Sequence, residues 1–253
     1  MTKRVKRALA ALLLAALLLP LAACGESKDL FLARKGEPRI AVLAAMNMEA
    51  KQLEKLLEEP ERFKHDGKSF VHGGMGGAHV ILHQGGMGLD KAEAGAKALI
   101  ESFQPDILIL FGMSGGIVPD VALYETVVAQ TVYAAWDFDI PAIATDETLV
   151  TIATEVLPHA RAAAIATGGK MTWTKKSYDL ISGTCGAVAV DQESYAVAKA
   201  AREANVPLLI IRSMSDTYDT TSLLGFFKYG PISAEKAAMD TETVIKKLGE
   251  QAG

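Results

Sequence analysis

The chain has 253 residues, of which 50% are hydrophobic and 22% are charged, and its formal net charge is −4. This composition excludes a disordered or collagen-like chain, and the acidic balance argues against a nucleic-acid-binding protein, which needs a basic surface. Two cysteines, Cys24 and Cys185, are too few for a disulfide framework.

The N-terminus combines a basic start with a short apolar stretch, a pattern typical of secretory signal peptides. The apolar stretch spans 12 residues, 8–19, whereas a membrane-spanning helix needs about 20. The Leu-Ala-Ala-Cys sequence at residues 21–24 resembles the lipobox of bacterial lipoproteins, a family in which the peptide is cut before the cysteine and the thiol receives a lipid. The resemblance implies a signal peptide over 1–23, a lipidated Cys24 and a tether over 24–38 that holds an exported domain at a bacterial membrane, on its periplasmic or cell-surface side. The alternative is an ordinary signal peptide that leaves Cys24 unmodified.

After Arg39, short apolar runs alternate with stretches of helical periodicity. The predicted strands cover residues 40–44, 79–83, 106–111, 127–132, 162–166, 187–190 and 208–211. Val71 and residues 79–83 flank a glycine-rich turn, which predicts a hairpin. The predicted helices cover residues 49–57, 92–103, 147–156, 194–204 and 234–248, with Asp90 and Ser233 as caps of the second and the last. Strands that alternate with helices predict one α/β domain over 39–253, with a mixed, mainly parallel twisted sheet flanked by helices.

Polar residues follow several of the predicted strands, at the sheet edge where ligands of such folds bind. Glu49, Glu193 and Asp216 come after three different strands, so we expect their carboxylates to converge beside a glycine-rich segment, residues 112–116. Mutual repulsion and burial raise the pKa values of converging carboxylates, which suits acid–base chemistry. Cleavage of a glycosidic bond needs an acid on the leaving group and a base on the attacking water. The alternative is that each acid only caps a helix, and composition and spacing alone leave the function open.

Three other kinds of site are disfavoured by the same sequence. Residues 112–116 match the Gly-x-Ser-x-Gly pattern of serine hydrolases, but no helix is predicted directly after Ser114, and one histidine, His159, follows it. The glycine clusters match no dinucleotide or phosphate-loop pattern, so no cofactor is expected. The histidines at 72, 79 and 83 are interpreted as edge-strand residues, because a further metal ligand is not evident.

Several blocks, in order from about Arg39 to the C-terminus, resemble the 5′-methylthioadenosine/S-adenosylhomocysteine nucleosidases of the nucleoside phosphorylase superfamily. Residues 45–49 carry the Ala-Met-x-x-Glu motif of that family, and residues 86–116 are similar to its Gly-x-Gly, Lys-Pro-Asp and Gly-x-x-Gly-Gly block. Residues 189–193 are similar to its Glu-Met-Glu segment, and residues 212–216 to its Arg-x-x-Ser-Asp segment. The resemblance implies a homodimeric enzyme with a nucleoside phosphorylase-like fold that hydrolyses a purine nucleoside.

The resemblance also implies roles for individual residues. Asp216, held by Ser215, protonates N7 of the departing purine, Glu193 binds the ribose 2′- and 3′-hydroxyls, and Glu49 polarises the attacking water. The remaining substrate contacts that it implies are Gln192, Ser114, Gly115, Met171, Thr172 and Phe226.

Differences from the family pattern leave the 5′-substituent of the substrate open. Met113 and the pair Asp191-Gln192 replace family residues, Ala134-Ala135 replaces His-Asp, and the loop over 136–143 is shorter. A phosphorylase is one alternative, but it needs a cationic phosphate clamp, and residues 45–50 contain no Arg or Lys. A non-catalytic nucleoside-binding lipoprotein is another, although a receptor has no need for Glu49 and Asp216 together.

Overall fold

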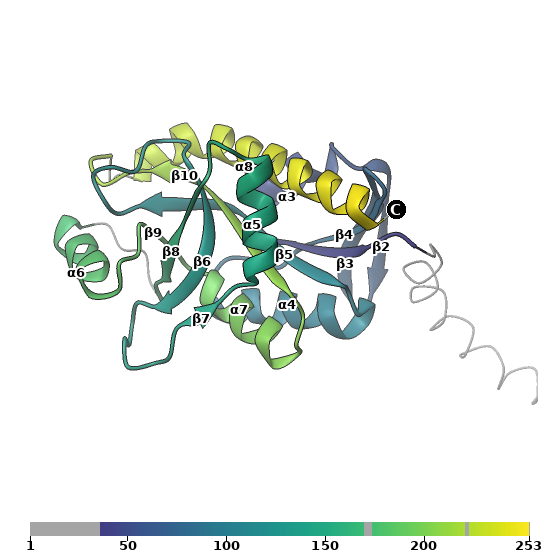
Figure 1. Cartoon of the computed structure of the whole chain (residues 1–253), viewed down its shortest axis with the longest axis horizontal. Coiled ribbons are helices and arrows are strands. Elements are labelled where there is room, and N and C mark those ends of the chain that lie inside the picture. Colours follow the sequence, from purple (N-terminus) through teal and green to yellow (C-terminus); the bar gives the residue numbers. More distant parts are fainter. Residues whose placement is uncertain (1–35, 170–173, 221–222, 253) are drawn as a thin grey trace, which may run out of the picture. The chain divides into compact units, whose positions relative to one another are not determined.

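A ten-stranded mixed sheet forms the centre of the domain (Figure 1). The computed structural model describes residues 36–169, 174–220 and 223–252. The predicted signal peptide, Cys24, most of the tether and the predicted substrate contacts Met171 and Thr172 lie outside these residues. Over the part of the chain that is described, no helix is both long and apolar enough to cross a membrane.

The sheet has a parallel centre and antiparallel additions. Its strands are β1 (Arg39–Ala44), β2 (Glu58–His65), β3 (Lys68–Met75), β4 (Ala78–Gln84), β5 (Ile107–Gly116), β6 (Thr126–Ala134), β7 (Ile143–Ala144), β8 (Arg161–Thr167), β9 (Ala189–Asp191) and β10 (Leu208–Asp216). Strands β4, β1, β5 and β10 run parallel to one another. The hairpin strands β2 and β3 extend the sheet on one side in antiparallel fashion.

Beyond β5 the sheet closes on itself. Strand β5 pairs in parallel with β10 and, at its last residues, antiparallel with β9, while β6 and β8 connect β10 to β9. The carboxyl end of β5 therefore lies between β10 and β9, and Gly115 pairs with both. This arrangement brings segments that are about a hundred residues apart in the sequence to one end of one strand.

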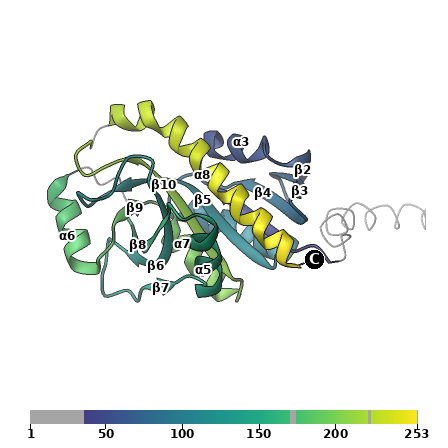
Figure 2. The ribbon, with the colours of Figure 1, turned by 45° about the horizontal axis from the view of Figure 1, so that its top comes forward.

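Helices cover both faces of the sheet (Figures 1 and 2). They are α3 (Asn47–Glu54), α4 (Leu89–Phe103), α5 (Glu147–Val156), α6 (Lys175–Cys185), α7 (Ser194–Glu203) and α8 (Leu223–Ala252). On one face, Leu53 of α3, Ala153 of α5 and Val244 of α8 pack in a single buried cluster with Val42 of β1 and Ile109 of β5. Helices α4 and α7 contact each other on the opposite face. The fold is the predicted α/β sheet with helices on both faces.

Most of the predicted elements are present, and several of them are longer than predicted, most of all the last helix, which begins at Leu223 rather than at residue 234. The helix over 147–156 matches α5, and the hairpin before residue 83 is β3–β4. Strand β5 continues through the glycines to Gly116, and β10 continues to Asp216. Residues 112–116 and 212–216, which were expected to follow a strand, therefore form the last part of one. The short β7 was not predicted, nor was β2, whose residues are almost all exposed and lack apolar alternation, nor α6, which has polar residues at most positions.

Three local expectations were wrong. Gly88, not Asp90, is the N-cap of α4, and Ser233 lies inside α8, where its hydroxyl donates a hydrogen bond to the carbonyl of Met214 (2.8 Å). Strand β4 is not an edge strand, because it pairs with β1 and β3, and His79 and His83 are accordingly buried.

Close packing of α8 against the β3–β4 turn makes Gly249 a sensitive position. A Cβ at Gly249 would overlap the carbonyl oxygen of Gly76 and lie 2.9 Å from the amide nitrogen of Ala78, and backbone atoms cannot yield cheaply. We expect Gly249→Ala to lower the free energy of unfolding by about 1–3 kcal/mol. The matched control is Gly183→Ala in α6, where a Cβ meets open space, and it should raise stability by up to about 1 kcal/mol. Equal denaturant midpoints for the two variants would contradict this packing.

Candidate active site

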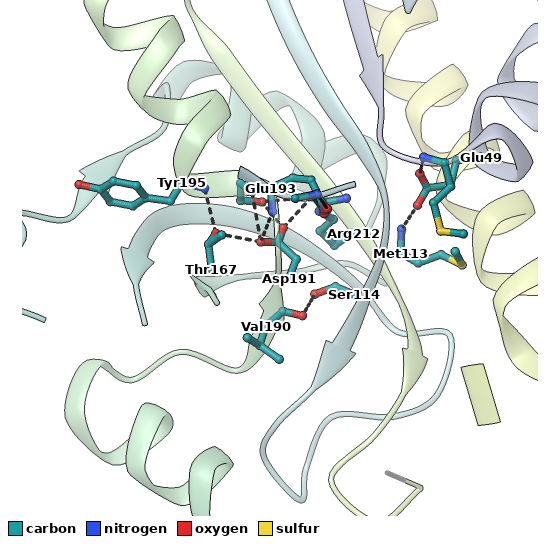
Figure 3. A network of polar contacts seen from close by, with 12 residues as sticks. Glu49, Met113, Ser114, Thr167, Val190, Asp191, Glu193, Tyr195 and Arg212 are labelled. Carbon is teal, nitrogen blue, oxygen red and sulfur yellow. Dashed lines mark hydrogen bonds and ion pairs between the residues drawn. The ribbon is translucent and has the colours of Figure 1, made fainter. Parts of the chain in front are cut away.

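The first carboxylate at the carboxyl edge of the sheet is that of Glu49. It lies in the first turn of α3, and its side chain turns back so that Oε2 accepts a hydrogen bond from the amide of Met46 (2.7 Å). Its Oε1 accepts a second from the amide of Met113 on β5 (2.8 Å; Figure 3). Burial raises the pKa of Glu49, while the charge of Arg212 and the backbone donors oppose that rise. Glu49 therefore caps its helix and also presents a buried carboxylate held from two elements.

Gly112 makes room for that carboxylate. Its φ of +144° lies in the region that side chains rarely adopt, and a Cβ there would overlap Oε1 of Glu49. The same Cβ would lie 3.1 Å from Nη1 of Arg212. The glycine thus lets β5 pass between the Glu49 carboxylate and the Arg212 guanidinium.

The second carboxylate, Glu193, lies where β9 leads into α7. Its Oε1 accepts a hydrogen bond from the amide of Gly88, which precedes α4 (2.9 Å), and its Oε2 lies 3.5 Å from Nη2 of Arg212. Burial raises the pKa of Glu193 to about 7; the charge of Arg212 and the Gly88 amide oppose this rise, and the charges of Asp191 and Glu49 add to it. This carboxyl therefore titrates near neutral pH.

Arg212 is the cation of this site and is completely buried within β10. Its Nη2 lies 2.6 Å from Oδ2 of Asp191, a closer partner than Glu193. Figure 3 shows Arg212 and Asp191 facing each other across the end of the sheet. Glu49, Asp191 and Glu193 therefore share one guanidinium, which leaves this end of the sheet rich in negative charge.

The third predicted carboxylate, Asp216, is the last residue of β10. The hydroxyl of Ser215 donates a hydrogen bond to its Oδ1 (2.9 Å), and β5 passes so close that a Cβ at Gly115 would lie 2.8 Å from Oδ2. Burial raises the pKa of Asp216, and the hydrogen bond from Ser215 lowers it. The carboxyl is therefore positioned by both strands and retains its proton more readily than an exposed aspartate.

One cavity joins these groups. Eight of the ten predicted catalytic and substrate-contacting residues line it, and the other two, Met171 and Thr172, lie outside the described residues. The predicted residues that line it are Glu49, Ser114, Gly115, Gln192, Glu193, Ser215, Asp216 and Phe226. Its other lining residues are Ala45, Met46, Met87, Met113, Val190 and Asp191. The carboxylates converge as expected, and five of the six additional lining residues are apolar.

Ser114 has a structural contact in this cavity. It lies in extended strand β5, and its hydroxyl donates a hydrogen bond to the carbonyl of Val190 on β9 (2.8 Å). A serine nucleophile of the Gly-x-Ser-x-Gly type lies instead on a sharp turn from strand to helix. Among the described residues, no group of three or more His, Cys, Asp and Glu side chains is arranged to hold a metal ion.

The sequence profile of the phosphorylase superfamily matches residues 39–246. The chain belongs to this superfamily. Over 230 residues it is 29% identical to the 5′-methylthioadenosine/S-adenosylhomocysteine nucleosidase of Chromohalobacter salexigens. The aligned region covers 83% of this chain and 98% of the relative.

Solved structures of this superfamily share the fold. The nucleosidase of the same name from S. pneumoniae, solved with a transition-state inhibitor, aligns with a TM-score of 0.77 and 24% identity over 82% of this chain and 98% of that one. The futalosine hydrolase of Helicobacter pylori aligns with a TM-score of 0.77 and 23% identity, over 83% of this chain and 98% of that one. The fold inferred from the sequence blocks is thereby confirmed.

The sequence alone indicates no role for Asp191 or Arg212. Both stood in the recognised blocks, but their contact joins two strands 21 positions apart and has no local pattern. A usable signal was present for Arg212, because a charged residue directly after the apolar run Leu208–Ile211 is costly to bury without a partner.

Proposed function

We propose that this protein hydrolyses the N-glycosidic bond of a purine nucleoside of the methylthioadenosine or adenosylhomocysteine kind, releasing the base and a ribose derivative. The observation that carries the proposal is the position of Glu49 and Asp216 on one cavity, which Glu193 lines as well. A protonated carboxyl and a water-activating carboxylate on one cavity are the two groups that glycosidic cleavage needs. Relatives that bear the nucleosidase name support the same reaction.

In the proposed reaction Asp216 protonates N7 of the purine, so that the base leaves as a neutral group. The Ser215 hydroxyl then stabilises the carboxylate that remains. Glu193, once ionised, accepts hydrogen bonds from the ribose 2′- and 3′-hydroxyls, and these strengthen as positive charge develops on the ring. Glu49 polarises the water that attacks the sugar.

Water is a better nucleophile than phosphate for this cavity. No lysine or arginine is among the described residues that line it, and the nearby Arg212 is completely buried and paired with Asp191. Glu49, Asp191 and Glu193 would repel a phosphate dianion, which binds best to paired cationic donors. The charge distribution therefore favours hydrolysis over phosphorolysis.

Methylthioadenosine tests the proposal directly. We expect the purified protein to release adenine in phosphate-free buffer, at a rate that added phosphate does not increase. Release that requires phosphate would assign the protein as a phosphorylase. Tight binding without any release would assign it as a nucleoside receptor.

We also propose that the protein is exported and anchored to a bacterial membrane through a lipid on Cys24, and that it forms a homodimer. The lipobox-like residues 21–24 support the anchor, and the family resemblance supports the dimer. Light scattering of detergent-solubilised protein tests the dimer, and a monomeric mass would contradict it.

The anchor has its own test in the full chain. We expect the wild type to sediment with membranes and to partition into detergent, because a lipid chain gains about 0.8 kcal/mol per buried methylene. Cys24→Ser should appear in the aqueous fraction, whereas the control Cys185→Ser should stay with the membranes. Equal partitioning of Cys24→Ser and the wild type would refute the anchor.

A further inference from the structure

Asp191 is held more firmly than any role assigned so far requires. Its side chain is only 2% exposed and accepts hydrogen bonds from the Thr167 hydroxyl (2.8 Å) and from the amides of Glu193 (3.3 Å) and Ser194 (3.1 Å). The Ser194 hydroxyl donates to it as well, and Arg212 completes the set (Figure 3). The carboxylate thus joins the end of β8, the start of α7 and the middle of β10.

Arg212, by contrast, is held mainly through one nitrogen. Its Nη2 contacts Asp191 at 2.6 Å and lies 3.5 Å from Glu193, while Nε and Nη1 are buried and have no hydrogen-bond partner among the described residues. Two carboxylates therefore compete for one guanidinium, and Asp191 is the closer of the two. The fixed position of Asp191 decides the competition in its own favour.

We propose that Asp191 is a positioning residue which, by pairing with Arg212, leaves the Glu193 carboxylate free to accept hydrogen bonds from the sugar hydroxyls. This inference rests on the proposed function, since it deepens the role of Glu193 in the same cavity. A two-point pair between Arg212 and Glu193 would occupy the oxygens that the sugar needs and make them weaker acceptors. Asp191 also accepts from the backbone amide of Glu193, so it orients that residue from its main chain.

Four groups face the Glu193 carboxyl, each from a different segment. They are Arg212 on β10, Asp191 on β9, Glu49 on α3 and the Gly88 amide before α4. The form that binds the sugar is the carboxylate, and with its pKa near 7 we expect kcat/KM of the wild type to rise as the pH rises through that value. Asp191→Asn removes a negative charge that raises the pKa of Glu193, and it also frees Arg212 to pair with Glu193. Both effects lower the pKa of Glu193, so the rise of kcat/KM should occur at lower pH than in the wild type.

The decisive experiment compares methylthioadenosine with its 2′,3′-dideoxy analogue in the wild type, Asp191→Asn and Asp191→Glu. For methylthioadenosine, we expect Asp191→Asn to raise KM by roughly ten- to hundredfold, the loss of one or two charge-assisted hydrogen bonds, with a smaller change in kcat. KM for the dideoxy analogue should hardly change, because it lacks the hydroxyls that Glu193 binds. Asp191→Glu keeps the charge and should restore the pH profile.

The outcomes separate positioning from packing. An equal loss on both substrates with an unmoved pH profile would overturn the proposal and leave Asp191 with a structural role only. If Asp191→Asn does not fold, Asp191→Ser replaces it, since it removes the charge and keeps a hydroxyl acceptor for the α7 amides.

If the wild type releases no adenine, the proposed reaction fails, and the same comparison is made by calorimetric binding of the two nucleosides. In that case selective weakening of the hydroxyl-bearing nucleoside supports the positioning role, and equal binding or no binding overturns it.

Discussion

Replacing Glu49 with Gln is expected to abolish most turnover while the protein stays folded. Gln has the same shape but cannot take up or attract a proton from water, and loss of such a group typically costs 10²–10⁴-fold in rate, as a rough range. The amide nitrogen of Gln also faces a backbone donor where Glu49 now has an acceptor oxygen, either at Met46 or at Met113. We therefore expect a loss of about 1–3 kcal/mol in unfolding free energy, which a domain of this size tolerates.

The control for this variant lies on the same helix. Glu54→Gln changes the same functional group at the end of α3, where Glu54 pairs with the largely exposed Arg62 outside the cavity. Its rate of adenine release should match that of the wild type, and its stability should change by less than about 1 kcal/mol. Wild-type activity in Glu49→Gln would show that another group activates the water.

The sequence predicts those parts of this fold in which local pattern and tertiary structure agree. Strand β1 and helix α5 follow from an apolar run and from helical periodicity, and both are buried as those patterns require. Strand β2 cannot be predicted from a local pattern, because it is an outer strand whose residues are mostly exposed. Its pairing with β3 defines it, rather than its own composition. The closure of the sheet through β5 and β10 likewise depends on pairings between distant segments, which one sequence does not show.

The site follows the same division. Each of the three carboxylates is recognisable from its place near the end of an apolar run, and the fold brings all three to one cavity. The competition of Asp191 and Glu193 for Arg212 depends on distances across strands, so only the folded chain reveals it. The lipid anchor at Cys24 and the contacts predicted for Met171 and Thr172 stay predictions.

Asp216→Asn is expected to reduce the rate of adenine release by roughly 10²–10⁴-fold and to remove from the pH profile the fall that ionisation of Asp216 causes. Asn can donate a hydrogen bond to N7 but cannot transfer a proton, so the base would have to leave as an anion. In the wild type the acid works only while protonated, and kcat/KM falls as the pH rises through the raised pKa of Asp216. That fall should be absent from Asp216→Asn.

Ser215→Ala changes the same part of the profile. The hydrogen bond from Ser215 lowers the pKa of Asp216, so the substitution should move the fall of kcat/KM that follows ionisation of Asp216 to higher pH. The control Asp219→Asn, at an exposed aspartate paired with Lys175, should change neither the rate nor the profile. A fall of kcat/KM with rising pH that persists unchanged in Asp216→Asn would assign the proton transfer to another group.

Stability gives a second measure of Asp216 that does not depend on turnover. Burial raises the pKa of Asp216 in the folded protein, so the folded state binds the proton more tightly than the unfolded chain does. The wild type therefore loses free energy of unfolding as the pH rises from the unfolded pKa through the raised folded one. Asn has no such ionisation, so the Asp216→Asn variant should gain stability relative to the wild type on going from acidic to alkaline buffer. A stability difference between the two proteins that does not vary with pH would contradict a raised pKa at this carboxyl, and with it the reason why Asp216 can hold the proton that the purine needs.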